Sequence, residues 1–268
     1  MNLYNFFAPV FTTNKNRSFI WDSKKQKLQV IKKIDSIDLE ILIGIENQKQ
    51  ILIKNTENFA KGNLTNNALL WGTRGNGKST LIKSVFIKIS NNYKNIKLIQ
   101  LNKKDIFDIE KIYTYLGKYN KYRFIVFIDD LSFENIDSDY KVIKSTLDGS
   151  ILNQPKNVIL YITSNRRHLM PRDMIDNERS SAIHTDESVE EKISLSDRFG
   201  LWIGFHNLNQ DEYINIIEKY CEYFGIKFNE DIKKNAIKWS LIRGNRTGRT
   251  AWQYIIDLSA EKNMKIKY

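Results

Sequence analysis

The sequence contains few of the features that mark secreted or membrane-spanning proteins. Its single cysteine, Cys221, has no partner for an internal disulfide, which excludes a small scaffold held together by disulfides. A membrane-spanning helix requires roughly 18 consecutive apolar residues, and the longest apolar runs here, such as 124–128 and 158–162, have only the length of strands. The first eleven residues carry no basic group before their apolar part, so we expect no signal peptide, no membrane association and a cytoplasmic location.

Proline is also scarce. Only Pro9, Pro155 and Pro171 occur in 268 residues, so most of the chain can form regular secondary structure. Hydrophobic residues make up 41% of the chain and aromatic residues 12%, which is enough to bury a core and excludes a wholly disordered protein. The length predicts one large domain, or one domain with a small second one.

The chain is basic, with a formal net charge of +11, and the surplus is spread along its whole length. Two interpretations remain open. A chain rich in Lys, Asn and Ile can carry surplus lysines on a solvated surface, and the even distribution favours this interpretation. The alternative is a face that binds a polyanion such as nucleic acid. The histidines His168, His184 and His206 have neither cysteine partners nor ligand spacing, so we expect no zinc site.

The pattern of apolar segments predicts three parts: an N-terminal appendage over 1–40, an α/β core over 41–205 and a helical lid over 206–268. The appendage is rich in aromatic residues, and we expect it to pack on the core. In the core, short apolar strands alternate with helices, which indicates a parallel sheet covered on both faces. The predicted strands are 68–72, 96–101, 123–129, 157–163 and 201–205. The predicted helices are 46–61, 78–92, 105–117 and 139–147 in the core and 210–224, 229–242 and 249–262 in the lid.

A glycine-rich segment between the first predicted strand and the next helix fits the pattern G-x-x-x-x-G-K-[ST]. It consists of Gly72, Thr73, Arg74, Gly75, Asn76, Gly77, Lys78 and Ser79. Glycines allow the backbone to turn and to bring its N–H groups against phosphate oxygens, and the N-terminus of the following helix adds partial positive charge. We expect Lys78 to reach the β- and γ-phosphates of a bound nucleotide and Ser79 to hold Mg²⁺. Thr80 completes the predicted nucleotide-binding segment.

Two consecutive carboxylates, Asp129 and Asp130, follow the apolar run 124–128. A parallel strand delivers the residues at its carboxyl end to the same sheet edge as the glycine-rich segment. We therefore expect Asp129 to hold Mg²⁺ through water, because Mg²⁺ prefers oxygen ligands, and Asp130 to polarise the attacking water. A strand that ends in two aspartates can also simply begin a turn.

Three further polar residues complete the candidate site. Asn165 follows the next predicted strand, where it can contact the γ-phosphate or orient water, or where it only terminates the strand. Arg198 precedes the last strand and is expected to reach the γ-phosphate of a neighbouring subunit, a role worth about 10³–10⁵ in rate; the alternative is a surface ion pair with Asp197. Arg249 begins the last helix and is expected to turn with the lid onto the phosphates. Arg246 is the alternative for this role, and a simple basic helix cap remains open.

In this order, the motifs resemble those of AAA+ ATPases. The segments NALLWGTRGNGKS, TSNRRHL and EEKISLSDRFGLWIGF are similar to a group of stand-alone bacterial AAA+ ATPases whose role is unassigned. The resemblance begins near residue 41 and implies a P-loop NTPase core with a five-stranded parallel sheet sandwiched by helices, plus a small C-terminal helical lid. It also implies a homo-oligomer that holds ATP and Mg²⁺ between subunits. The segment LIGIE at 42–46 resembles the adenine-contacting segment of the family, which assigns Ile43 and Gly44 to the nucleotide site.

Most of the superfamily has Asp–Glu where this chain has Asp129–Asp130, and the shorter side chain implies slow turnover. Three functions remain open. The first is an oligomeric ATPase that remodels an unidentified macromolecule. The second is a slow nucleotide-dependent adaptor that presents residues 1–40, or Arg166 and Arg167, to a protein partner. The third is a DNA-linked ATPase similar to helicase loaders or replication initiators, although no DNA-binding module is recognisable. We also expect a long polar loop within 166–190.

Overall fold

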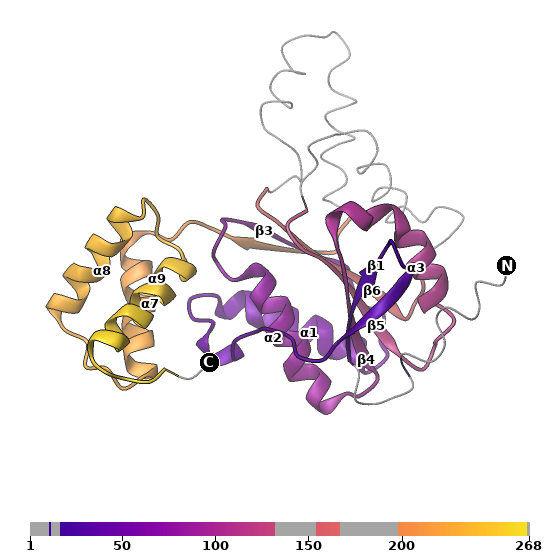
Figure 1. Ribbon diagram of the computed structural model, residues 1–268, viewed down its shortest axis with the longest axis horizontal. Helices are drawn as coiled ribbons and strands as arrows, with labels where there is room; N and C mark the ends of the chain where they lie inside the picture. The colour runs from indigo at the N-terminus through magenta and orange to yellow at the C-terminus, as the bar shows by residue number, and fades with distance from the viewer. Residues whose placement is uncertain (1–10, 12–16, 132–153, 167–197, 267–268) are drawn as a thin grey trace, which may run out of the picture.

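One mixed sheet forms the centre of the molecule (Figure 1). The computed structural model describes residues 11, 17–131, 154–166 and 198–266. Within these ranges, seven strands follow one another across the sheet in the order β2-β1-β4-β5-β6-β3-β7. The strands are β1 (Ser18–Asp22), β2 (Lys27–Ile31), β3 (Ala68–Gly72), β4 (Ile96–Leu101), β5 (Arg123–Ile128), β6 (Val158–Ser164) and β7 (Leu201–Phe205).

The helices of the described residues agree with the predicted ones to within about two residues, except that 105–117 is split into a 3₁₀ helix and an α-helix and that the short 3₁₀ helix 39–41 was not predicted. They are η2 (Leu39–Ile41), α1 (Glu46–Ala60), α2 (Lys78–Asn92), η3 (Lys103–Asp108), α3 (Ile109–Leu116), α7 (Gln210–Tyr223), α8 (Glu230–Ile242) and α9 (Gly248–Glu261). None of these described helices has the length and apolar character needed to cross a bilayer. The predicted helix 139–147 lies outside the described residues, as does the predicted polar loop apart from Arg166.

The five predicted strands are present and mutually parallel, which confirms the α/β class. The prediction of a five-stranded sheet was wrong in number, because the N-terminal segment supplies two more strands. β1 pairs with β4 in parallel, from Ser18 opposite Leu98 to Ile20 opposite Gln100, and β2 returns antiparallel beside β1. The physical reason is burial: Phe19 and Trp21 alternate along β1 onto one face and lie within the hydrophobic core.

Both faces of the central strands are apolar. In β5, Phe124, Val126 and Ile128 face the side covered by η3 and α3. Ile125 and Phe127 alternate with them and face α1 and α2. A continuous apolar run is therefore the signature of a parallel strand that helices cover on both sides. Figure 1 shows α1 and α2 on one side of the sheet and α3 on the other.

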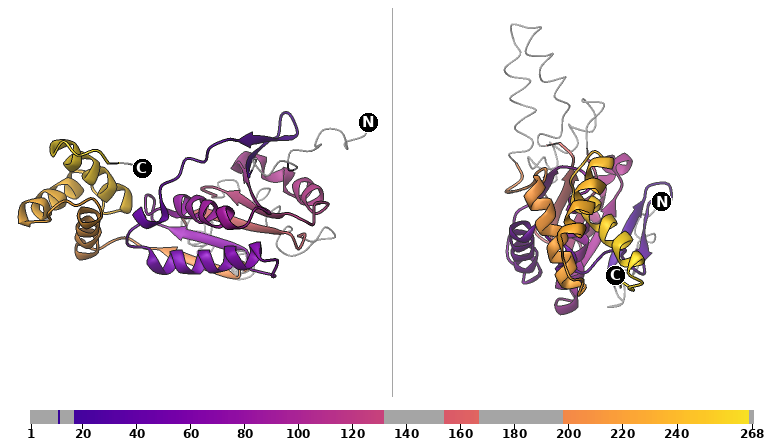
Figure 2. Two further views of the ribbon diagram at one scale, coloured as in Figure 1. Left: turned by 90° about the horizontal axis from the view of Figure 1, so that it is seen from below. Right: turned by 90° about the vertical axis from the view of Figure 1, so that its left-hand side faces the viewer.

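The helices α7, α8 and α9 form a bundle beside the sheet, at one end of the molecule (Figures 1 and 2). Each begins at a side chain that accepts a hydrogen bond from its first turn: Asn209 at 2.8 Å, Asn229 at 2.9 Å and Thr247 at 3.1 Å. The bundle has its own apolar centre, which includes Tyr213, Ile217, Ala251 and Ile255. Ile41 of η2 packs into this centre, so the core and the lid share part of their packing.

Candidate functional site

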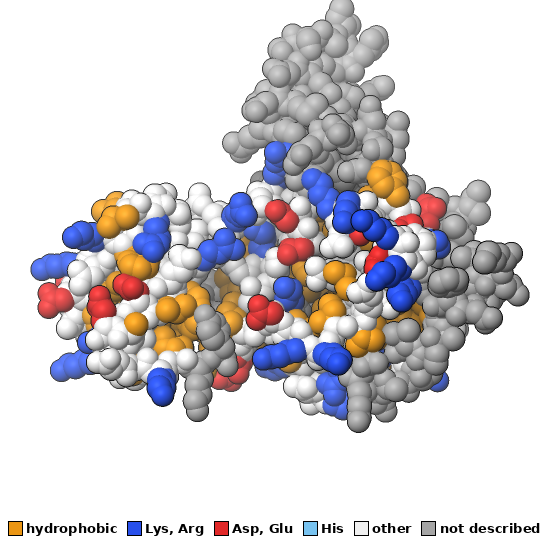
Figure 3. All heavy atoms as spheres, in the orientation of Figure 1, with side chains coloured by type: hydrophobic (Ala, Val, Ile, Leu, Met, Phe, Trp, Pro, Cys, Tyr) orange, Lys and Arg blue, Asp and Glu red, His pale blue; other side chains and the backbone are white. Residues whose placement is uncertain are grey.

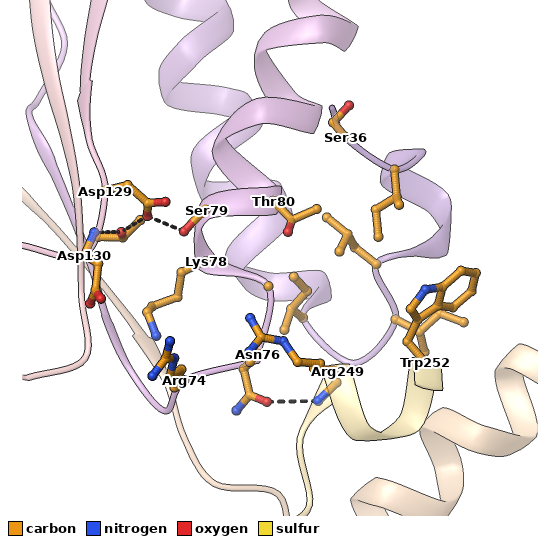
Figure 4. A pocket seen from close by; sticks show the side chains of 18 of the residues that line it. Ser36, Arg74, Asn76, Lys78, Ser79, Thr80, Asp129, Asp130, Arg249 and Trp252 are labelled. Atoms are coloured by element: carbon orange, nitrogen blue, oxygen red, sulfur yellow. Dashed lines mark hydrogen bonds between the residues drawn. The ribbon is translucent and has the colours of Figure 1, made fainter. Parts of the chain in front are cut away.

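A cavity of about 490 Å³ opens between the carboxyl edge of the sheet, the start of α2 and the lid (Figure 4). Its size is within the usual range for small-molecule sites. One end, which we call the loop end, is lined by residues 74–80 with Asp129, Asp130, Thr163 and Asn165. The other end, which we call the lid end, is lined by Ile37, Leu42, Ile43, Ile45, Tyr220 and Trp252.

The glycine-rich segment forms the loop predicted between β3 and α2. Gly72, Gly75 and Gly77 have φ angles of +120°, +89° and +84°, in the region that favours glycine. At Gly72 the space also requires it, because a Cβ atom would lie 2.0 Å from the carbonyl oxygen of Phe205 on β7. The loop therefore packs closely against the edge strand β7, and it turns sharply enough for the start of α2 to line the cavity.

Lys78 lies at the centre of the loop end and is only 7% exposed. Its Nζ donates hydrogen bonds to the carbonyl oxygens of Gly72 at 2.7 Å and Thr73 at 2.8 Å, and to Oδ1 of Asn165 at 3.0 Å. Burial lowers the pKa of Lys78 to about 8, against the opposing attraction of Asp130 and Asp129. The ammonium group is thus desolvated and positioned where phosphate oxygens can replace carbonyl oxygens as its partners.

The two carboxylates lie opposite the start of α2, as predicted. The Ser79 hydroxyl donates to Oδ1 of Asp129, and the Thr163 hydroxyl donates to the same atom at 2.6 Å. Thr163 also accepts a hydrogen bond from the backbone N–H of Asp130 at 2.8 Å. Asp130 itself has a φ angle of +52°, an uncommon backbone conformation for aspartate. Thr163 thus orients both acidic residues, and the sequence analysis missed it because a threonine near a strand end carries no distinctive signal.

Asn165 connects the two charged groups of the loop end. Its Nδ2 donates to Oδ1 of Asp130 at 2.5 Å, while its Oδ1 accepts from Lys78. The sequence placed Asn165 directly after a strand, and β6 ends at Ser164. The structure therefore brings the predicted Asn165, Asp130 and Lys78 into one hydrogen-bonded chain, in which the position of each side chain depends on the other two.

The lid contacts the loop directly through the first residues of α9. The N–H of Gly248 donates to Oδ1 of Asn76 at 3.0 Å, and the N–H of Arg249 donates to the Gly75 carbonyl at 2.8 Å. Asn76 donates in turn to the carbonyl of His206 at 2.7 Å, just beyond β7. Figure 4 shows Asn76 and Arg249 side by side, between the glycine-rich loop and the start of α9.

These contacts place the predicted Arg249 against the loop end, where its charge, together with that of Arg74, lowers the pKa of Lys78 further. The alternative residue, Arg246, does not line the cavity. Its guanidinium instead lies 3.5 Å from the side-chain oxygen of Gln210, at the start of α7. The structure thus separates the two arginines that the sequence left as alternatives.

The lid end is apolar and is assembled from distant segments. Ile43 lines it as predicted, whereas Gly44 lines a smaller adjoining cavity of about 140 Å³. Tyr220 of α7 and Trp252 of α9 also line it, with ring centroids 5.4 Å apart. In the sequence, Tyr220 is only one member of the apolar stripe of a helix, and Trp252 belongs to no motif. Neither has a local signal, because both line the cavity only through the packing of α7 and α9 beside the rest of the chain.

Two of the predicted loop residues and one arginine lie outside the cavity lining. Gly72 and Thr73 do not line the cavity, and the Thr73 hydroxyl donates to Oδ1 of Asn207 at 2.6 Å. Arg198 precedes the amino end of β7, whereas the loop follows the carboxyl end of the parallel strand β3. The five-residue strand β7, roughly 17 Å long at about 3.3 Å per residue, separates Arg198 from the loop. Arg198 is therefore on the opposite edge of the sheet from the cavity.

A sequence profile for a family described as "protein of unknown function (DUF815)" matches residues 14–262. The chain belongs to this family. The match covers the sheet, the loop and the lid of the DUF815 chain, so all three parts fall within the family. No curated protein matches the chain. The family assignment therefore agrees with the predicted group of proteins whose role is unassigned.

Among solved structures, the DUF815 chain is similar to a point mutant of RuvB from Thermotoga maritima, with a TM-score of 0.53 and 18% identity over 84% of this chain and 66% of that one. It is similar to a second point mutant of the same RuvB, with a TM-score of 0.50 and 18% identity over 82% of this chain and 63% of that one. It is also similar to domain III of the replication initiation protein DnaA from Thermotoga maritima, with a TM-score of 0.50 and 15% identity over 84% of this chain and 88% of that one.

At these identities the likeness concerns the fold. It confirms the predicted P-loop NTPase core of AAA+ type, with the correction to seven strands. The DUF815 chain spans 66% of the length of the first RuvB mutant and 63% of the length of the second. The activities and partners of those proteins therefore carry over to this one only as proposals.

Proposed function

We propose that the protein is an AAA+ ATPase that binds ATP with Mg²⁺ in the cavity and hydrolyses it to ADP and phosphate. The observation that carries this proposal is the hydrogen-bonded network at the loop end. Lys78, Ser79, Asp129, Asp130 and Asn165 come from three separate segments and meet beside a glycine-rich loop at the N-terminus of α2. This is an arrangement suited to phosphoryl transfer, which depends mainly on positioning and on electrostatic stabilisation.

Each loop-end residue has a role that its chemistry supports. Backbone N–H groups of residues 74–79 and the Lys78 ammonium hold the phosphates. Ser79 and Asp129 fit a Mg²⁺ ion because they offer two adjacent oxygen ligands, and phosphate and water complete the shell that this ion prefers. The ion would neutralise charge on the β- and γ-phosphates. Asp130 accepts a proton from the attacking water, and Asn165 holds the carboxylate of Asp130 in position.

The lid end suits the adenine base. Its lining includes Ile43 and the rings of Tyr220 and Trp252, and aromatic rings favour contact with a flat heterocycle. Gly44 borders the adjoining cavity, where its backbone can contact the edge of the base. Arg249 spans the two ends from the start of α9, so we assign it to the phosphates.

The position of Arg198 supports an oligomer. This residue lies on the sheet edge opposite the cavity, too far away to reach a nucleotide bound to its own chain. In a homo-oligomer, Arg198 of one subunit would stabilise the charge on the γ-phosphate held by the next. We further propose that residues 41–205 and 206–268 act as core and lid, that 1–40 is an appendage to them, and that hydrolysis drives the remodelling of an unidentified macromolecule.

Asp130 favours a second candidate function. Most of the superfamily carries the longer glutamate at this position, so the carboxylate of Asp130 approaches the attacking water less closely. The same site would then hydrolyse ATP slowly and act as a nucleotide switch that presents a surface to a protein partner.

Mixing two inactive variants tests the proposal. Arg198→Ala and Lys78→Ala should each abolish ATP hydrolysis, the first while retaining nucleotide affinity. A mixture should regain activity, because interfaces form in which the Lys78→Ala subunit supplies Arg198 to an intact loop end. Wild-type activity per molecule should also rise with protein concentration. Full activity of Arg198→Ala alone would contradict the role of Arg198 in trans. If neither the wild type nor Arg198→Ala binds ATP, the proposed ATPase function itself is contradicted.

A further inference from the structure

Two basic segments that are about eighty residues apart in sequence meet on one surface. The turn between β1 and β2 packs on η3 through two side-chain hydrogen bonds. Ser23 Oγ donates to Oδ1 of Asp105 at 2.6 Å, and Trp21 Nε1 donates to Oδ2 of Asp108 at 2.8 Å. The turn carries Lys24 and Lys25, and the segment beneath it carries further lysines. The tertiary structure thus concentrates a charge that is evenly spread along the sequence.

Two acidic groups of this region, Asp105 and Asp108, are held by hydrogen bonds within the protein. Asp105 is 6% exposed and accepts a second hydrogen bond from Asn102 at 3.1 Å. Asp108 accepts a second one from Gln26 at 3.4 Å. Each carboxylate is therefore engaged by neutral donors and holds the two segments together, while its charge does not cover the lysines above it.

The side chains that remain on the outside form what we call the hairpin surface. It comprises Lys24, Lys25, Lys104, Phe107 and Lys111, all exposed. Lys25 lies 4.0 Å from Asp22, and Lys111 donates to the side chain of Gln26. Figure 3 shows Lys and Arg side chains gathered over the region of β1 and α3. The exposed ion pair of Lys25 with Asp22 is weak, and the Gln26 side chain is uncharged, so the lysines remain available to an anionic partner.

Phe107 is the second, independent feature of this surface. Its side chain is 56% exposed, although its neighbours Ile106 and Ile109 are fully buried. The helix η3 and the residue after it therefore place two apolar side chains in the core and one aromatic ring outside, among lysines. Single-stranded nucleic acid is recognised by this combination, with cations along the phosphates and aromatic rings against the base faces.

We propose that the hairpin surface binds single-stranded nucleic acid, with the lysines on the phosphates and Phe107 stacked on a base. An acidic peptide would use the lysines but has no flat face for the ring. In a duplex the base faces are stacked inside, so the ring would have no partner.

η3 follows the carboxyl end of β4, at the sheet edge that also carries the loop end of the cavity. The proposed binding of single-stranded nucleic acid does not require that the protein hydrolyses ATP.

The lysines are tested by reversing their charge. The affinity of the full-length protein for a fluorescently labelled single strand of about 20 nucleotides is measured by anisotropy at several salt concentrations. Lys24→Glu with Lys104→Glu should weaken binding at least about tenfold near 0.1 M salt and reduce the slope of log affinity against log salt by about 1.4 or more. The matched control, Lys234→Glu with Lys238→Glu on α8, changes the net charge equally and should change the affinity less than about threefold.

The ring is tested separately. Phe107→Ala should weaken binding of the single strand about tenfold, because stacking on one base is lost, and should leave the salt slope and duplex binding unchanged. Phe107→Tyr should retain the affinity. Since Phe107 is exposed, these variants should unfold at the wild-type temperature.

Three results would overturn the proposal: absence of binding at low salt, an equal loss of affinity in the α8 control, or competition by polyglutamate as effective as that by unlabelled single strand. The third would assign the surface to an acidic protein partner. In the absence of nucleotide, Lys78→Ala should bind the single strand with wild-type affinity. This measurement tests nucleic-acid binding independently of the proposed ATPase, so either proposal can fail without the other.

Discussion

The two ends of the cavity are built in opposite ways. The loop end consists of polar groups held by hydrogen bonds, and most of it comes from one continuous segment of the chain, 74–80. The lid end consists of apolar side chains from three separate segments: residues 37–45, α7 and α9. A fixed network of short polar contacts defines the first end, whereas the second exists only while the lid packs beside Ile41 and against Gly75 and Asn76.

This difference separates two properties of a binding site. Under the proposed function, charged groups at the loop end would act on the phosphates that every nucleotide shares, so they would determine the affinity. The apolar lid end would act on the base, so it would determine selectivity, and this selectivity would depend on how α7 and α9 pack beside the core. Substitutions at either end, or at the link between them, should therefore have separable effects.

Removal of the ammonium group should have the largest effect. Lys78→Ala is expected to weaken ADP and ATP binding by at least about 100-fold, because charge-assisted hydrogen bonds contribute about 1.5–3 kcal/mol each. Isothermal titration calorimetry measures this loss. Lys88→Ala, an exposed lysine on the same helix, should bind like the wild type. Retention of affinity within threefold in Lys78→Ala would show that the loop end does not hold the phosphates.

Removal of the aromatic wall should affect the base alone. Trp252→Ala is expected to weaken ADP binding about tenfold, since base–aromatic stacking contributes about 1–3 kcal/mol, while the affinity for inorganic tripolyphosphate stays unchanged. Trp239→Ala is the matched control, because Trp239 belongs to the lid but does not line the cavity. If tripolyphosphate binding falls equally, Trp252 acts through the fold of the lid and the comparison fails.

The loop end should also respond to pH. Burial lowers the pKa of Lys78 to about 8, so the ammonium loses its proton as the pH rises through this value. Bound phosphates favour the protonated form and raise the pKa in the complex, so affinity is highest below pH 8 and decreases above it. Between about pH 7.5 and 9, ADP affinity should fall by about tenfold. Lys78→Arg should give a flat profile, because arginine stays protonated; an equally steep profile would assign the effect to another group.

The link between the two ends should give the smallest effect. Asn76→Ala removes the partner of the Gly248 N–H and of the His206 carbonyl. Each neutral hydrogen bond contributes about 1 kcal/mol, so hydrogen exchange at the start of α9 should accelerate about fivefold, while ADP affinity changes less than threefold. Asn92→Ala, at the exposed end of α2, is the control. Unchanged exchange would mean that Asn76 does not hold the lid against the loop.

The sequence predicted the loop end well because its signals are local. Spacing of glycines, a lysine and a serine within 72–79 specifies a backbone turn without reference to the rest of the chain. The five central strands could be predicted for a similar reason: runs such as 124–128 are apolar at every position, which only a strand covered on both faces requires. The positions of Asp130 and Asn165 followed, since parallel strands end at one edge.

The remaining features required the tertiary structure. The number of strands, the facing of Tyr220 and Trp252 into the cavity and the role of Thr163 have no local pattern. Helical periodicity shows that a stripe such as that of α7 is apolar, but it does not show whether the stripe meets other helices or a ligand. In the same way, composition established the positive charge, whereas the packing of a hairpin on η3 decided where lysines and an exposed phenylalanine come together. Local backbone conformation depends mainly on neighbouring residues, so the sequence can predict it. The composition of a surface depends on which distant segments pack against each other, and only the tertiary structure shows this.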